Sequence, residues 1–296
     1  MNFDSMNPQN SPQNNKGWYE GIWDDNTTQV VRVFRPREVL TLLENIDIED
    51  ETGDKSRKWL RKESRNLSTN DIREWLHFLL YSGCRFSEAV MIHDHPNLLR
   101  TSGNIRLPNV PGGKEMRTIK ARNIYLSNYG RENIQKFFDA KSLPTNGKPE
   151  VDQTLTSLTL IMHKAGERIG LPEETFTKVI KEKEKDPQTG EYVTYEAVIR
   201  DKHTHKERTV LRYKKITKPY IITTNACMVR SMRKTWESWL FKYYSGKYGP
   251  DMRDDIYLSQ GHTKRTAAQH YINLADFTPE DLQDIERLVK GYGEVE

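Results

Sequence analysis

Three separated segments of this 296-residue chain carry side chains that together could act on a phosphate ester. The first holds Arg85, the second holds Arg230 and Arg233, and the third holds His262 with Tyr271 nine residues later. A planar guanidinium can bind two phosphate oxygens at once, and a histidine can move protons near neutral pH. A tyrosine hydroxyl can serve as the nucleophile. This set of side chains, with a lysine added, is sufficient to cleave a phosphodiester without a metal ion.

The order of these segments resembles that of the tyrosine recombinases, also called phage-type integrases. Ser82-Gly83-Cys84-Arg85-Phe86-Ser87-Glu88 resembles the first arginine box of the family, where Thr-Gly-Leu-Arg-x-Ser-Glu is common. The segment from Arg230 to Arg233 is similar to the family's His-x-x-Arg, and Gly261-His262 is similar to its Gly-His. The matched segments span roughly residues 67–290, which is the whole expected catalytic domain.

The resemblance implies a role for each matched residue. Arg85 and Arg233 would bind the non-bridging oxygens of the scissile phosphate, and Tyr271 would attack the phosphorus to form a 3′-phosphotyrosine. His262 would donate a hydrogen bond to that phosphate or assist proton transfer. Arg230 stands where the family commonly has histidine, so it departs from the pattern and would act as a basic helper.

In this family a lysine on a β-hairpin protonates the leaving 5′-oxygen. The stretch from Lys120 to Leu126 resembles the common Lys-x-Arg-x-Val-x-Leu pattern and favours Lys120, while Lys114 beside the Pro-Gly-Gly turn is the competitor. Glu88 fits a buried acid that orients the arginine three residues before it. Basic side chains near these segments are expected to contact DNA phosphates: Lys114, Arg117, Arg122, Lys234, Lys264 and Arg265.

The composition fits a soluble protein with an anionic partner. The net charge is +4, and the excess positive charge lies in residues 67–222, which carry 26 basic and 19 acidic side chains. A basic region favours nucleic acid through counterion release. No apolar run approaches the roughly 18 residues of a membrane span, and residues 1–16 lack a signal core. With only two cysteines, the default expectation is a cytoplasmic, reducing location.

Capping residues and apolar periodicity predict a mainly helical protein. A helix should begin after Ser68 and end at Gly83, and another should begin near Phe86, which puts Arg85 in the junction between them. Strands are expected within residues 103–127, and β-hairpins within 172–222. Further helices are expected at about 36–46, 130–140, 154–169, 227–245 and 278–290, with short helices beside His262 and Tyr271.

The expected fold class is mainly α with a small antiparallel β-sheet (α+β), similar to a tyrosine recombinase catalytic domain. Residues 1–66 would form a disordered tail and a short DNA-binding arm. Residues 67–296 would form the catalytic domain, with a β-hairpin-rich insertion at 172–222. The C-terminal helix, 278–291, is expected to dock on a neighbouring protomer, because its apolar stripe is too large to leave in water.

The resemblance therefore implies a site-specific recombinase that integrates or excises a mobile element, similar to archaeal or viral members. Double-stranded DNA and further copies of the chain, as a tetramer on synapsed DNA, would be its partners, and no cofactor or metal is expected. Two alternatives remain open: a type IB topoisomerase-like nicking-closing enzyme, and a non-catalytic DNA-binding regulator. A C-terminal helix that docks on a neighbour would favour the recombinase over the topoisomerase.

Overall fold

The computed structural model describes residues 31–48, 60, 66–110, 121–200, 205–248, 259–261 and 277–293. The described part is mainly helical and contains three two-stranded antiparallel sheets, so the expected α+β class is confirmed. Within these ranges, no helix is both long and apolar enough to cross a membrane. The described residues fall into two compact units, a helical unit of residues 31–173 and 225–293 and a second unit of residues 174–224.

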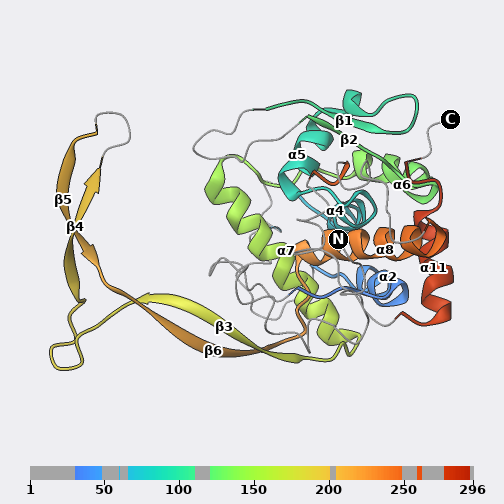
Figure 1. Ribbon diagram of the computed structural model, residues 1–296. Helices are drawn as coiled ribbons and strands as arrows, with labels where there is room; N and C mark the ends of the chain where they lie inside the picture. The colour runs from blue at the N-terminus through green and yellow to red at the C-terminus, as the bar shows by residue number, and fades with distance from the viewer. Residues whose placement is uncertain are drawn as a thin grey trace. The chain divides into compact units, whose positions relative to one another are not determined.

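In the helical unit, α4 (Thr69–Ser82) and α8 (Val229–Tyr248) lie at the centre and pack against each other (Figure 1). The core beneath them contains the fully buried rings of Trp75, Trp236 and Trp239. Around this pair lie α2 (Pro36–Glu44), α5 (Phe86–Asp94), the 3-10 turn η3 (Pro96–Leu98), α6 (Asn128–Asp139), α7 (Lys148–Arg168) and α11 (Pro279–Val289). A small sheet pairs β1 (Ile105–Leu107) with β2 (Arg122–Ile124).

The junction that carries Arg85 forms as the sequence predicts. The Ser68 hydroxyl accepts the backbone N–H of Asp71, whose carboxylate accepts the N–H of Ser68, so a capping box starts α4. Gly83 ends the helix in the left-handed region at φ +60°, where a side chain is strained. Arg85 then caps α5 in an extended conformation. The chain therefore turns sharply between two helices, directly at the predicted arginine box.

The first described residues belong to the helical unit, although we expected residues 1–66 to form a separate region. The backbone N–H of Phe34 donates to the Thr235 hydroxyl at 3.0 Å, and the indole N–H of Trp239 donates to the Phe34 carbonyl at 3.0 Å. Phe34 itself is fully buried. Residues 31–48 thus complete the core beside α8, and the predicted DNA-binding role of this region stays a prediction.

The C-terminal helix packs on its own chain, which corrects our expectation that it docks on a neighbouring protomer. The side chains of Ile285, Leu288 and Val289 are buried where α11 contacts α8, α6 and α2. Each such burial contributes about 1.5–3 kcal/mol. The Lys290 carbonyl also accepts the backbone N–H of Asn128 at 2.9 Å. The premise that the stripe needs a cover was sound, but three helices of the same chain supply that cover.

The described residues of the second unit, 174–200 and 205–224, form a β-ribbon, in line with the β-hairpins expected within residues 172–222 (Figure 1). Ten residue pairs join β3 (Glu174–Lys183) to β6 (Lys215–Thr224), and seven join β4 (Thr194–Arg200) to β5 (Glu207–Tyr213). An isolated bridge between Lys185 and Tyr192 lies between the two ladders. The four strands thus form two successive two-stranded pairs, which we call the ribbon.

Candidate active site

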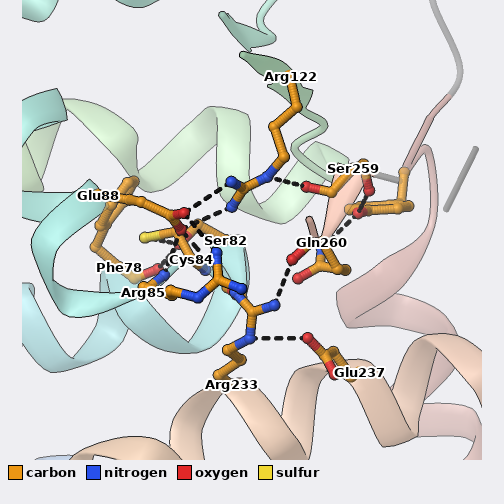
Figure 2. A network of polar contacts seen from close by, with 12 residues as sticks. Phe78, Ser82, Cys84, Arg85, Glu88, Arg122, Arg233, Glu237, Ser259 and Gln260 are labelled. Atoms are coloured by element: carbon orange, nitrogen blue, oxygen red, sulfur yellow. Dashed lines mark hydrogen bonds and ion pairs between the residues drawn. The ribbon is translucent and has the colours of Figure 1, made fainter. Parts of the chain in front are cut away.

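A single buried carboxylate, that of Glu88, gathers three arginines from different parts of the chain (Figure 2). Glu88 lies in the first turn of α5, and its side chain is only 1% exposed. Arg85 comes from the α4–α5 junction, Arg122 from β2 and Arg233 from α8. The sequence predicted a buried acid that orients Arg85, and Glu88 has that geometry.

Arg85 is the most exposed of the three guanidinium groups. Its Nη1 donates to Glu88 Oε1 at 2.9 Å, and its backbone N–H donates to Glu88 Oε2 at 2.7 Å. The side chain keeps 36% of its surface exposed. One edge of the guanidinium is therefore fixed by the carboxylate, while the remaining N–H groups can reach an anion from solvent.

Arg122 has a different position from the DNA contact that we expected. Its side chain is 7% exposed and forms a two-pronged ion pair with Glu88, with both N–O distances at 2.7 Å. Its Nε also donates to the Ser259 carbonyl at 2.8 Å. Because these three bonds face inward, Arg122 cannot bind a DNA phosphate in this arrangement. Instead it links β2, α5 and the segment 259–261.

Arg233 is also buried, with 6% of its side chain exposed. Its Nη1 donates to the Gly83 carbonyl at 2.9 Å, and its Nη2 donates to the Gln260 carbonyl. Its Nε lies 2.9 Å from Glu237, one turn further along α8. The predicted second arginine therefore connects the arginine box with the segment that leads into His262, although Gly83 and Arg233 are 150 residues apart in sequence.

The two glycines of the matched boxes are tightly packed in the same place. A Cβ on Gly83 would lie 2.4 Å from Gln260 Oε1 and 2.6 Å from Trp236 Cδ1. A Cβ on Gly261, at φ +77°, would lie 3.0 Å from the guanidinium of Arg122. Glycine thus allows the backbone to approach closely at both positions. This close approach brings the first and third predicted boxes against each other.

The charges around Glu88 keep its carboxylate ionised. Burial alone would raise the pKa of Glu88, but the hydrogen bonds and charge of Arg122 and the nearby charge of Arg233 lower it to about 2. Three guanidinium groups face the two carboxylates of Glu88 and Glu237, which leaves a net charge of +1 at this centre. Because Arg85 is the group that reaches solvent, that excess can act on an anion there.

Other predicted residues show a mixed outcome. Arg230 is exposed, one turn before Arg233 on α8. Lys234 was expected to contact DNA, but it is half-buried, and burial lowers its pKa. Lys120, Lys114, Arg117, His262, Lys264, Arg265 and Tyr271 lie outside the described residues, so their predicted roles stay predictions.

Sequence reasoning missed some residues that hold the centre together. Alternation along β2 could have placed Arg122 inward, because it shares a strand face with the buried Ile124. The i,i+4 spacing of Arg233 and Glu237 signals an ion pair on one helix face. Tyr292 bonds the Ser259 hydroxyl and the Gln260 amide, and no local pattern announces that contact. Burial raises the pKa of Tyr292 to about 12, which suits a structural tyrosine better than a nucleophile.

Comparison with known proteins identifies no relative: no protein-family model, curated protein or solved structure matches the chain. The functional argument therefore depends on the residues and their geometry.

Proposed function

We propose that the chain is a DNA strand-breaking and rejoining enzyme that acts through a covalent 3′-phosphotyrosine, and that its biological role is site-specific recombination. One observation carries the proposal. Arg85 and Arg233, matched to two separate boxes, both lie within ion-pair distance of Glu88, and Arg233 holds the carbonyl of Gln260, two residues before His262. Surface arginines matched by chance would have no reason to converge in this way.

In this proposal the three arginines have different tasks. Arg85 binds the scissile phosphate, since its guanidinium is fixed on one edge and exposed on the other. Fixed cationic donors stabilise the charge that develops on the phosphate without reorganising during the reaction. Arg122 and Arg233 act from behind, because they hold the backbone of Ser259 and Gln260. For Arg233 this positioning role replaces the direct phosphate contact that the resemblance implied, because its side chain is buried. His262 and Tyr271 would enter the site along the chain that follows.

The exposed position of Arg230 is compatible with phosphate binding, the task assigned to Arg85. It lies one helical turn before Arg233, where the resemblance places a basic helper. An exposed guanidinium one turn away could donate to the same phosphate as Arg85. Lys120 remains the preferred general acid and Lys114 its competitor.

The packing of α11 affects the choice between the two enzymatic functions. A helix that docks on a neighbour would have favoured synaptic oligomers, but α11 is covered by α8, α6 and α2 of its own chain. The type IB topoisomerase-like alternative, which acts as a monomer, therefore remains a second candidate. Relaxation of a supercoiled plasmid without a specific site would favour it, whereas exchange between two defined sites would favour the recombinase.

A covalent-adduct assay tests the chemistry common to both. The protein is incubated with labelled double-stranded DNA that carries the attachment site of its element, and denaturant-resistant complexes are counted. The wild type should form an adduct and Tyr271→Phe should not, while DNA affinity stays near normal, because only the nucleophilic oxygen is lost.

Tyr292→Phe is the matched control, since Tyr292 is the described tyrosine that bonds Ser259 and Gln260. It should still form an adduct. An adduct that persists in Tyr271→Phe, or one that disappears only in Tyr292→Phe, would show that the nucleophile is assigned wrongly. If the protein binds DNA but forms no adduct with any DNA substrate, the non-catalytic DNA-binding regulator becomes the better interpretation.

A further inference from the structure

The part of the sequence that forms the ribbon carries the whole net positive charge of the chain. Residues 174–224 contain twelve basic and eight acidic side chains, a net charge of +4, which equals the net charge of all 296 residues. The other residues carry 34 basic and 34 acidic side chains, so their charges balance. The net attraction of the chain for an anionic partner therefore originates in the second unit.

Within the ribbon, the β4–β5 pair separates its charges between two faces. Directly opposed residues of an antiparallel pair share a face, and successive residues of a strand alternate between the faces. One face has two arginines and no acidic side chain. We call it the arginine face, and it comprises Tyr195, Ala197, Ile199, Arg208, Val210 and Arg212. The opposite face carries both glutamates of the two strands, Glu196 and Glu207, and Arg200 lies directly across from Glu207.

The neighbours of the two arginines leave their charge available to a partner. Arg208 lies directly opposite Ile199, and Arg212 lies directly opposite Tyr195, so neither has an acid as its cross-strand neighbour. Both arginines are exposed, and Tyr195 is 48% exposed. The arginine face thus presents two guanidinium groups and a phenol to solvent on one side of a strand pair.

The dimensions of this face suit duplex DNA. A guanidinium binds phosphate oxygens through its planar fork, and a tyrosine hydroxyl also donates to phosphate. Arg208 and Arg212 are four residues apart on β5, which corresponds to about 14 Å. The major groove of DNA is about 12 Å wide and admits a two-stranded β-ribbon. Two guanidinium groups at this separation can therefore reach phosphates on both borders of the groove.

We propose that the arginine face of β4 and β5 is a DNA-binding surface that enters the major groove of a duplex. Arg208 and Arg212 contact phosphates, Tyr195 adds its hydroxyl beside Arg212, and the opposite face points away from the DNA. This surface supplies affinity, while the chemistry stays with the centre at Glu88. The choice of DNA as the anion rests on the proposed function, whereas the separation of charges between the two faces does not.

The affinity of the full chain for a labelled duplex of mixed sequence tests the assignment, because phosphate contacts do not depend on sequence. Arg208→Ala and Arg212→Ala should each weaken binding about three- to tenfold and lower the slope of log affinity against log salt by about 0.9. Arg200→Ala is the matched control: it removes the same charge from the opposite face and should change the affinity less than about twofold. Arg208→Lys keeps the charge and should bind nearly as well as the wild type, which separates a lost contact from misfolding.

A duplex with bulky groups on the C5 atoms of its thymines tests the groove, because these atoms lie in the major groove. The wild type should bind this duplex less tightly than the unmodified one. The difference should shrink in the double variant Arg208→Ala/Arg212→Ala. Equal binding of both duplexes by the wild type would overturn the major-groove assignment.

Other outcomes separate this surface from the enzymatic function. Equal weakening by Arg200→Ala and Arg208→Ala, or weakening by neither, would overturn the DNA-binding face even if adducts form normally. A protein that binds through the arginine face but forms no adduct would contradict the enzymatic function alone. If Arg208→Ala weakens the binding of poly-glutamate but not that of the duplex, the face binds an acidic protein and the proposal is wrong.

Discussion

Replacing Glu88 by glutamine should destabilise the helical unit strongly at neutral pH. Glutamine keeps the shape of the carboxyl group but removes the charge that Arg122, Arg85 and Arg233 share. Breaking a buried ion pair by removing one partner costs about 3–5 kcal/mol, because the remaining charge is buried without compensation. The pKa gives an independent figure: a fall from 4.5 to about 2 corresponds to about 3 kcal/mol.

The pH dependence makes the prediction specific. A carboxyl group whose pKa is lower in the folded protein than in the unfolded chain adds stability above the unfolded pKa. That contribution is lost as the pH falls from about 5 through the folded pKa of about 2. Protonated wild-type Glu88 then resembles the glutamine of the variant. The difference in the free energy of unfolding should therefore be full at pH 7 and should shrink steadily below pH 4.5.

Urea unfolding followed by tryptophan fluorescence measures this difference, because Trp75, Trp236 and Trp239 are buried in the core. Titrations at pH 7, 5, 4 and 3 give the trend for wild type and Glu88→Gln. Glu132→Gln, an exposed position on α6, is the matched control and should change stability by less than about 0.5 kcal/mol. A difference that stays constant between pH 7 and pH 3, or a variant as stable as wild type at pH 7, would refute the reasoning.

The other expectations concern the same centre. Arg85→Ala should slow adduct formation about 10²–10³-fold with little loss of stability, because its side chain is partly exposed. Arg233→Ala should lose both activity and about 3–5 kcal/mol of stability, because its side chain is buried. Equal urea unfolding midpoints for the two variants would contradict this. Gly83→Ala should lower the free energy of unfolding by about 2–4 kcal/mol, because the new Cβ strains the backbone and clashes with two side chains. Gly170→Ala is the control, because φ is also positive there (+71°) but the space around it is open, so it should lose only about 1–2 kcal/mol in the same urea unfolding measurement. Lys120→Ala should lose cleavage of normal DNA but recover on a substrate with sulfur at the bridging 5′ position, because a thiolate leaves without a proton; no recovery would count against Lys120 as the acid.

Local patterns in the sequence were enough to predict most of the elements. The Ser68 capping box, the Gly83 terminus and the Phe86 start were all predicted from residues within a few positions, because caps and left-handed ends depend on local backbone bonds. The same holds for α11, which starts after its Thr278 cap and lies within the expected range 278–290. Helix α7 begins earlier than expected, at Lys148 rather than about residue 154.

The sequence also indicated which distant residues lie together in space. The matched boxes named Arg85 and Arg233 together, and the structure places both at Glu88. It brings the Gln260–Gly261 backbone to the same centre. Parts of all three matched boxes therefore lie at one centre, while the catalytic roles stay predictions.

Only the tertiary structure decided what each side chain faces. Arg122 reads as a DNA contact in sequence, but it is enclosed between Glu88 and Ser259, 34 and 137 residues away. The amphipathic stripe of α11 indicates that its apolar face packs against other helices, but it does not indicate whether those helices belong to the same chain or to another. Here α8, α6 and α2 supply it. Periodicity records how much surface must be buried, whereas the partner depends on contacts between residues far apart in the chain, which no local pattern encodes.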